Sequence, residues 1–453
     1  MASVPGSHYN VFAGNQTVNF GVTSDPNNVP APVSGDFNLE VITNASGTGI
    51  FSTASGYQGL AVLSTNGSVF TAEHSNYGVV DTGGNDSIFA GDGNIAIGGA
   101  AGDTLVGGTG ASQFIDAHLG HQLVIGGSAG NTTIWGGTGD TIQGGAGNVT
   151  IGGGAGATIT GGTGSYFIAA DAGNQSVTGG SSGNGTIWGG AGDTIQGSAG
   201  NVTIGGAAGD TIAGGTGTWF IDADKGNQSI VGGSAGNGTI WGGAGDTIRG
   251  GAGNVTIGGV AGDTIVGGTG NEFIDGSLGN QSITGGSAGN ETIWGGVGDT
   301  IRGGSGGNET IAGVSGSTIT GGAANTFIDA TAGNESIAAG AGNTTVWGAN
   351  GDTVQGADAG GNATIAFGAI HSAETYWDDG NTTSAGNDTV VNFSQATGDR
   401  VSLNSGTDNA STVVAGATAD GSGNAVLHLS DGSSVTLVGV TLASLNTTFF
   451  TTH

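Results

Sequence analysis

Tryptophan recurs in this chain at a fixed interval. Five of its seven tryptophans stand 53 residues apart: Trp135, Trp188, Trp241, Trp294 and Trp347. Phenylalanine follows the same interval at Phe114, Phe167, Phe220 and Phe273, with Phe327 coming 54 residues later. Self-similarity at a fixed period is typical of repeat proteins, in which each unit buries its apolar face against its neighbours. The period therefore predicts a repeat fold and argues against most enzyme folds.

Composition narrows the possible folds and partners. Gly accounts for 104 of the 453 residues, but only four prolines are present and no G-X-Y period occurs, which excludes a collagen triple helix. With 34 acidic and four basic residues, the chain carries a net charge of −30. We expect it to repel nucleic acids and anionic membrane surfaces and to attract cations. The absence of cysteine excludes disulfides and thiolate metal sites.

Targeting and membrane segments are not evident in the sequence. The first residues, MASVPGSHYNVFAGNQ, lack the basic and apolar regions of a cleavable signal peptide. No stretch approaches the about 20 apolar residues that a membrane helix needs. We therefore expect no membrane insertion and no cleavage of an N-terminal signal.

Within each 53-residue unit, apolar anchors recur every 8 to 10 positions. In one copy they are Ile187, Ile195, Ile204, Ile212, Ile221, Ile230 and Ile240. Each anchor lies in a short β-favouring triplet such as DTI or VTI, and the glycines that follow permit a tight turn. A helix needs a 3.6-residue period and tolerates this glycine density poorly, so the pattern excludes helix.

Two such steps make one turn of a flattened coil. The turn has 17 to 19 residues, and three turns fill one 53-residue unit. Because stacked strands lie about 4.8 Å apart, one unit rises roughly 14 Å. We predict an all-β, parallel β-solenoid over residues 81–367, a β-rich N-terminal cap or assembly segment over 1–80, and a C-terminal β cap over 368–453.

Two segments carry a resemblance to a known family. Gly84–Asn85–Asp86–Ser87–Ile88 and Gly386–Asn387–Asp388–Thr389–Val390 match the motif G-G-x-G-x-D-x-U-x, in which U is a large aliphatic residue. The chain thus resembles the RTX, or hemolysin-type, β-roll proteins. The apolar, Ser/Thr-rich end VTLVGVTLASLNTTFFTTH is similar to the C-termini of that family. The resemblance implies type I secretion from a bacterium with an uncleaved C-terminal signal, an extracellular or cell-surface location, and folding on calcium.

The resemblance also implies calcium ligands, for which Asp86 and Asp388 match best. A further series keeps Asp two residues before the anchor in a loop shortened by one residue: Asp103, Asp140, Asp193, Asp210, Asp246, Asp263, Asp299 and Asp352. We expect these carboxylates along one edge of the solenoid in two of every three turns, with Gln228, Gln281 or Glu335 in the third. Either they bind calcium, or each accepts hydrogen bonds from its own turn and stays solvated.

The recurrent aromatics are expected to face outward, because the neighbours of an inward strand residue point outward. Trp188 follows the anchor Ile187, and Phe220 precedes the anchor Ile221. A row of exposed rings indicates a contact surface. Packing against another copy or the chain's own ends, stacking on sugar rings, and rings that simply lie flat on the sheet all remain open.

These features favour an extracellular structural protein that self-assembles into a filament, surface layer or biofilm matrix. The alternative is a calcium-dependent adhesin that binds surface polysaccharide. A polysaccharide-modifying enzyme is a remote alternative, since catalysis needs a unique constellation and this chain repeats its side chains. An acidic cluster of His371, Glu374, Asp378 and Asp379 fits a solvated loop better than a metal site.

Overall fold

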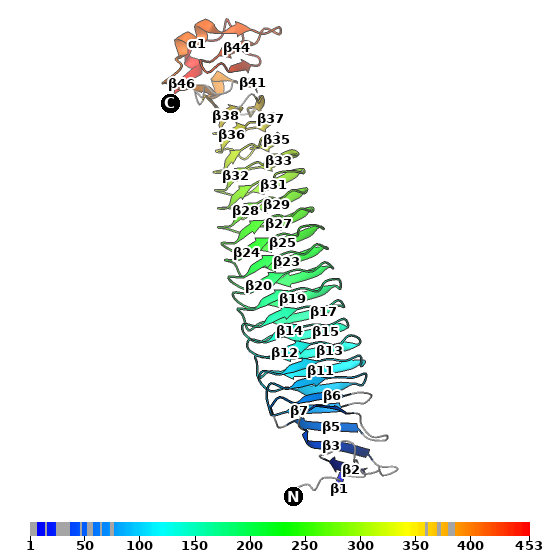
Figure 1. Cartoon of the computed structure of the whole chain (residues 1–453). Helices are drawn as coiled ribbons and strands as arrows, with labels where there is room; N and C mark the ends of the chain where they lie inside the picture. The colour runs from blue at the N-terminus through cyan, green and yellow to red at the C-terminus, as the bar shows by residue number, and fades with distance from the viewer. Residues whose placement is uncertain are drawn as a thin grey trace. The chain divides into compact units, whose positions relative to one another are not determined.

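The computed structural model describes residues 7–13, 16–23, 37–45, 48–51, 58–63, 66–72, 77–357, 361–368, 373–378 and 386–453. The chain is an all-β, parallel β-solenoid with about 17 turns of ~18 residues, as the spacing of the anchors predicts (Figure 1). Contacts divide it into two compact units, residues 1–222 and 223–453, which are described one at a time.

In the first unit, each turn contributes one strand to each of two sheets. Sheet A, which carries the recurrent tryptophans, contains β1 (Ser7–Ala13), β2 (Gln16–Thr23), β3 (Phe37–Ala45), β5 (Gln58–Leu63), β7 (Tyr77–Asp81), β9 (Ile95–Gly98), β11 (Ser112–Ala117), β13 (Asn131–Gly136), β15 (Asn148–Gly152), β17 (Tyr166–Ala170), β19 (Gly185–Gly189), β21 (Val202–Gly205) and β23 (Trp219–Ala223). Sheet B contains β4 (Thr48–Phe51), β6 (Val69–Ala72), β8 (Ser87–Phe89), β10 (Thr104–Val106), β12 (Leu123–Ile125), β14 (Thr141–Gln143), β16 (Thr158–Thr160), β18 (Ser176–Thr178), β20 (Thr194–Gln196) and β22 (Thr211–Ala213).

The anchors form the core because they stack in register. On sheet A, Ile134 pairs with Ile151, and Ile168 pairs with Ile187. On sheet B, Ile142 pairs with Ile159. All of these side chains are buried. The core is therefore two facing rows of Ile and Val, and each turn is stabilised mainly by its immediate neighbours.

Strand pairing crosses the expected boundary at residue 81. In sheet A, β7 pairs in parallel with both β5 and β9, so the described strands before residue 81 continue the solenoid pairing. At the start of the sheet, β1 instead pairs with β2 in antiparallel fashion, from Ser7↔Val22 to Ala13↔Gln16. This hairpin occupies one edge of β2, an edge that would otherwise be open to another strand.

The second unit repeats the two-sheet arrangement. Its sheet A contains β25 (Gly238–Gly242), β27 (Val255–Gly258), β29 (Glu272–Gly276), β31 (Glu291–Gly295), β33 (Asn308–Ala312), β35 (Asn325–Asp329), β37 (Thr344–Trp347), β39 (Ala363–Ala366), β41 (Asn387–Val391), β43 (Thr418–Ala419), β44 (Ala425–His428) and β45 (Ser434–Leu437). Its sheet B contains β24 (Ser229–Val231), β26 (Thr247–Arg249), β28 (Thr264–Val266), β30 (Ser282–Thr284), β32 (Thr300–Arg302), β34 (Thr318–Thr320), β36 (Ser336–Gly340), β38 (Thr353–Ala357), β40 (Thr375–Trp377), β42 (Arg400–Leu403) and β46 (Phe450–Thr452).

The end of the second unit departs from parallel pairing. Strand β41 pairs in parallel with β45, but β44 pairs with β45 and β43 with β44 in antiparallel fashion. A short helix, α1 (Ala410–Gly416), begins at the N-cap Asn409, whose side chain accepts a hydrogen bond from the Thr412 N–H. The 3₁₀ turns are η1 (Gln395–Thr397) and η2 (Thr447–Phe449). None of the described helices is long and apolar enough to cross a bilayer.

Asparagine side chains connect successive turns at the strand starts. In the second unit, the Asn237 side chain accepts a hydrogen bond from the Asn254 N–H, and Asn254 accepts one from Asn271. Asn271 likewise accepts from the Asn290 N–H at 2.8 Å. Side-chain amides can thus bond to the backbone of the next turn, where strand pairing has not yet begun.

The interior also holds aromatic rings that the sequence pattern did not assign to the core. Tyr166 and Trp219 lie two residues before their anchors, so they point inward, and both are buried. Gly185 is the register partner of Tyr166, and a Cβ on Gly185 would lie 2.0 Å from two ring carbons of Tyr166. The large side chain is therefore accommodated by the glycine of the next turn.

Candidate functional site

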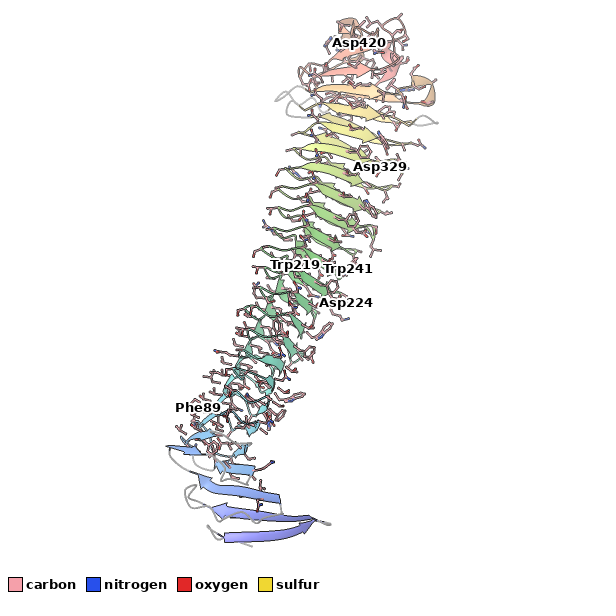
Figure 2. All side chains as sticks on the ribbon, turned by 90° about the vertical axis from the view of Figure 1, so that its right-hand side faces the viewer. Phe89, Trp219, Asp224, Trp241, Asp329 and Asp420 are labelled. Carbon is pink, nitrogen blue, oxygen red and sulfur yellow. The ribbon has the colours of Figure 1, made fainter. Side chains whose placement is uncertain are left out.

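The recurrent tryptophans lie on the outer face of sheet A in each unit, and Figure 2 labels Trp241 among them. Their exposed fractions are 56% for Trp135, 44% for Trp188, 47% for Trp241, 50% for Trp294 and 51% for Trp347. Phe114 and Phe167 are each 40% exposed, whereas Phe220, Phe273 and Phe327 are half-buried. We call this set of tryptophans and phenylalanines the aromatic face. Its orientation follows from strand alternation.

The rings of Trp188 and Trp241 each cover a glycine of the following turn. A Cβ on Gly205 would lie 2.1 Å from Cε3 of Trp188, and a Cβ on Gly258 would lie 2.3 Å from Cε3 of Trp241. The ring can lie against the sheet only because these positions are glycine. One face of the indole is therefore buried, and the other is left to solvent or a partner.

In the second unit, two phenylalanines of the aromatic face pack edge-on against the tryptophan of the following turn. Phe273 meets Trp294 edge-on with ring centroids 4.9 Å apart, and Phe327 meets Trp347 in the same way at 4.8 Å. Such pairs contribute about 0.5–1.5 kcal/mol beyond the area they bury. The rings are therefore fixed in position, which lowers the entropy lost when a partner binds them.

Carboxylates accompany several of the tryptophans. Asp275 is the register partner of Trp294, and Asp329 is the register partner of Trp347. Both are outward and half-exposed, and each accepts a backbone hydrogen bond from the residue two positions later. In the first unit, Asp116 pairs with Trp135 in the same way. The aromatic face thus presents a ring beside a fixed acceptor.

The Asp series on sheet B lies inside the solenoid, so the expectation of a solvated edge is wrong. We call it the carboxylate column: Asp86, Asp103, Asp140, Asp193, Asp210, Asp246, Asp263, Asp299 and Asp352, each 1% exposed. These residues stand two positions before an inward anchor, so strand alternation points them inward as well.

Apart from Asp86, each carboxylate of the column accepts hydrogen bonds from backbone N–H groups of two turns. Asp193 accepts from Gly190 of its own turn through Oδ2 at 2.9 Å and from Gln175 of the preceding turn through Oδ1 at 2.7 Å. Asp246 accepts in the same way from Gly243 and Gln228. These donors satisfy both oxygens, so these carboxylates are held without a cation.

Burial changes the acidity of the column. It raises the pKa of Asp193, Asp246 and Asp299 above the usual range, while the two N–H donors of each work against the increase. For Asp352, burial raises the pKa to about 6. In the turn before Asp352, burial and the Asp352 charge raise the pKa of Glu335 to about 7. Desolvation therefore outweighs hydrogen bonding in this column.

Three carboxylates gather near the start of the column, and we call them the Asp cluster: Asp81, Asp86 and Asp103. An oxygen of each lies within 4.8 Å of the others, and all three side chains are buried. Asp81 Oδ2 and Asp86 Oδ2 have no hydrogen-bond donor. Burial, together with the neighbouring Asp103 and Asp86, raises the pKa of Asp81 to about 8. Hard oxygens with unused lone pairs suit a calcium ion.

The motif residue Asp388 lies elsewhere, on β41 of sheet A in the second unit. Its carboxylate accepts hydrogen bonds from the N–H groups of Ala357 and Ala363 and from the hydroxyl of Tyr376 at 2.8 Å. Asp388 is thus placed inside the fold by donors, and its charge raises the pKa of Tyr376 further above a value already raised by burial.

The second acidic cluster expected from the sequence is only partly described, since His371 and Asp379 lie outside the described residues. Glu374 and Asp378 are buried, so they do not form a solvated loop. Glu374 accepts the Gly368 N–H at 2.7 Å, and Asp378 accepts the Asn404 N–H at 3.3 Å. Both carboxylates cap backbone turns.

Comparison of the chain with protein-family models, with curated proteins and with solved structures gave no match.

Proposed function

We propose that this chain is a secreted extracellular structural protein that self-assembles into a filament, surface layer or biofilm matrix. The aromatic face carries the proposal. Within each unit it places half-exposed rings on the outer face of sheet A every third turn, roughly 14 Å apart at the strand spacing of about 4.8 Å. Exposed apolar surface repeated at this interval favours a partner with the same period, and a second copy of the chain has that period.

Charge sets the condition for assembly. Copies with a net charge of −30 repel one another, so close packing requires counterions or salt. The Asp cluster fits calcium by its unpaired buried oxygens, and an ion there would replace the repulsion among Asp81, Asp86 and Asp103 with attraction. Calcium binding and type I secretion follow from the resemblance to RTX proteins and form part of the same proposal.

The test is electron microscopy of the purified full chain with and without calcium. We expect filaments or lattices for the wild type and dispersed particles when the five recurrent tryptophans are changed to Ser. The matched control changes the five outward threonines on the same strands to Ser: Thr133, Thr186, Thr239, Thr292 and Thr345. Normal assembly of the tryptophan variant, or monodisperse wild type at high concentration with calcium, contradicts the proposal.

A calcium-dependent adhesin that binds surface polysaccharide is the second candidate, and the carboxylates beside Trp135, Trp294 and Trp347 favour it. Sugar rings stack on indoles, and their hydroxyls donate to fixed acceptors such as Asp275 and Asp329. A glycan array probed with soluble protein tests this. We expect binding to fall when Asp275→Asn and Asp329→Asn are combined, whereas assembly alone would leave the array blank with wild type.

A further inference from the structure

Three inward glutamates interrupt the interior of sheet A in the second unit. Glu272, Glu291 and Glu309 occupy successive turns, and we call them the glutamate triad. At the equivalent positions 53 or 54 residues earlier, the chain has Trp219, Gly238 and Val255. An aromatic, a glycine and an aliphatic residue are thus all replaced by Glu in three consecutive turns. In these three turns, acidic side chains thus replace the interior residues of the preceding repeat.

The triad is stacked and enclosed. Glu272 pairs in register with Glu291, and Glu291 pairs with Glu309. Their side chains are 5%, 3% and 3% exposed, respectively. The N–H groups of Gly268 and Gly286 donate to one oxygen of Glu272 and Glu291, and the Thr326 hydroxyl donates to Glu309 Oε2 at 3.0 Å. Each glutamate is therefore held through one oxygen.

The other oxygen of each glutamate has no donor. Glu272 Oε2, Glu291 Oε2 and Glu309 Oε1 are buried without a hydrogen-bond partner. Glu272 and Glu291 converge, since a Cβ on Gly286 would lie 2.5 Å from an oxygen of Glu291 and 2.9 Å from Glu272 Oε2. Leaving charged oxygens buried and unpaired is costly, so the arrangement requires protons or a cation.

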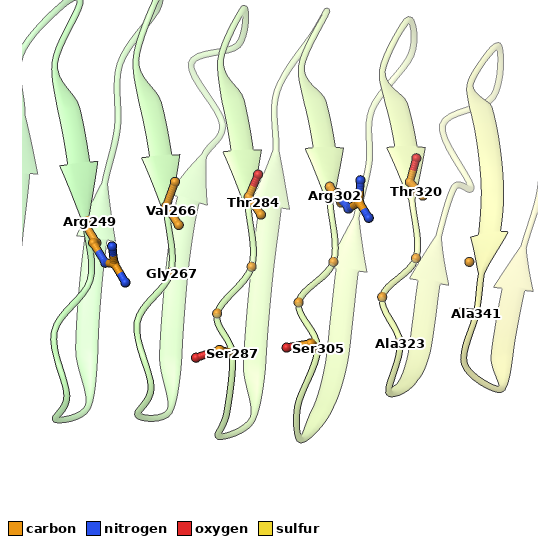
Figure 3. Close-up of a pocket in the computed structure, with 17 residues that line it drawn as sticks. Arg249, Val266, Gly267, Thr284, Ser287, Arg302, Ser305, Thr320, Ala323 and Ala341 are labelled. Atoms are coloured by element: carbon orange, nitrogen blue, oxygen red, sulfur yellow. The ribbon is translucent and has the colours of Figure 1, made fainter. Parts of the chain in front are cut away.

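A surface groove of about 470 Å³ is lined by residues from the turns that hold the triad. The glycines that contact the glutamate oxygens, including Gly267, Gly285 and Gly303, also line this groove (Figure 3). Only glycine backbone therefore separates the triad from solvent there. Arg249 and Arg302 line the groove as well, but no basic side chain contributes to the acidity of the triad.

We propose that Glu272 and Glu291 bind a hard divalent cation inside the second unit, with Glu309 as the neighbouring carboxylate of the next turn. Carboxylate oxygens are the ligands that calcium and magnesium prefer, and glycine carbonyls of the adjacent turns can supply more. Two paired carboxylates balance one divalent charge. The site is distinct from the Asp cluster, which lies in the first unit.

The acidity of the triad agrees with this inference. Burial and the neighbouring Glu291 raise the pKa of Glu272 to about 8, and burial raises the pKa of Glu291 and Glu309 as well. Without a cation, Glu272 would hold a proton at neutral pH. A cation would displace it, so binding should release protons and tighten as pH rises.

The test measures bound metal in the full chain after chelation and dialysis against calcium at neutral pH. The key variant restores the interior of the preceding repeat, with Glu272→Trp, Glu291→Gly and Glu309→Val, and a second variant combines Glu272→Gln with Glu291→Gln. The control is Asp224→Asn, which removes an exposed carboxylate of the second unit outside the triad. Wild type and control should bind one more calcium per chain than either triad variant.

Proton release gives a second readout. Calcium addition should release protons from wild type and not from the triad variants, and calcium should raise the melting temperature of wild type by more than that of the variants. Equal calcium content and equal melting shifts for wild type and both variants would overturn the proposal, and the triad would then be a protonated cluster. Because the Asp cluster is intact in every variant, its own calcium binding cancels in the comparison.

Discussion

The hydrogen bonds of the carboxylate column predict a large effect of a single substitution. Changing Asp193 to Ala removes the acceptor of two buried N–H groups, those of Gly190 and Gln175. Each buried donor left unpaired costs about 1–3 kcal/mol, which gives about 2–6 kcal/mol for the pair. Burial raises the pKa of Asp193, so relief of a buried charge offsets part of this cost. We expect a net loss of about 2–4 kcal/mol.

Urea unfolding followed by tryptophan fluorescence measures this loss. Trp188 lies on the strand directly before Asp193 and reports on the same turn. Solenoids unfold by neighbouring turns, so the local transition is the relevant one. The measurement is made in chelator and repeated in calcium. A loss of stability below about 1 kcal/mol in chelator is smaller than expected for two unpaired N–H donors and would refute the hydrogen-bond account. A loss seen only in calcium would instead identify Asp193 as a metal ligand.

The reverse substitution, which introduces an Asp into the carboxylate column, tests the same account. Ala157 stands where most other turns have a buried polar residue, usually Asp or Gln, and it is buried itself. Ala157→Asp should accept the N–H groups of Gly154 and Asp140, by analogy with Asp193. We expect stabilisation of about 0.5–1.5 kcal/mol, the net value of a satisfied hydrogen bond. Destabilisation would mean that the cost of burying a new carboxyl group exceeds the gain from satisfying the two N–H donors.

Three further outcomes follow from the interior and the outer face. In chelator, the stability of the second unit should fall as pH rises from 4.5 towards 8, because the pKa of Glu272 is about 8 when folded and 4.5 when unfolded. The slope is at most about 1.4 kcal/mol per pH unit. Melting temperatures that rise over this pH range would contradict this prediction. Gly185→Ala should destabilise by about 1–3 kcal/mol through its clash with Tyr166, and Tyr166→Val should suppress the effect in urea melts. Trp188→Ser should cost less than about 2 kcal/mol, since the ring is half-exposed, and a larger loss would identify it as core.

Strand alternation accounts for most of what the sequence could predict. The anchors, their 8-to-10-residue steps and the outward rings follow from inward residues recurring at fixed spacing. The same rule, applied two positions before each anchor, would have placed Asp193, Tyr166 and Glu272 inside. The alternative that these carboxylates stay solvated was wrong, because a side chain two positions before an inward anchor also points inward, whatever its charge.

Other features needed the assembled turns. Asp81 matches no motif, and it joins Asp86 and Asp103 only because β7 pairs beside the following turns. The covering of Gly205 by the Trp188 ring depends on which turn lies next to it. Both contacts link residues from different turns whose side chains must first be stacked.

The sequence by itself determined the coil, its turn length and which side chains face outward, because these depend on local alternation and on glycine at the turns. Tertiary structure alone decided which polar groups are satisfied. A buried carboxylate is stable or costly according to the donors that the preceding turn presents, so Asp193 finds two N–H groups whereas Glu272 and Glu291 find one each. That difference separates a structural column from a candidate cation site, and it exists only once the turns are stacked.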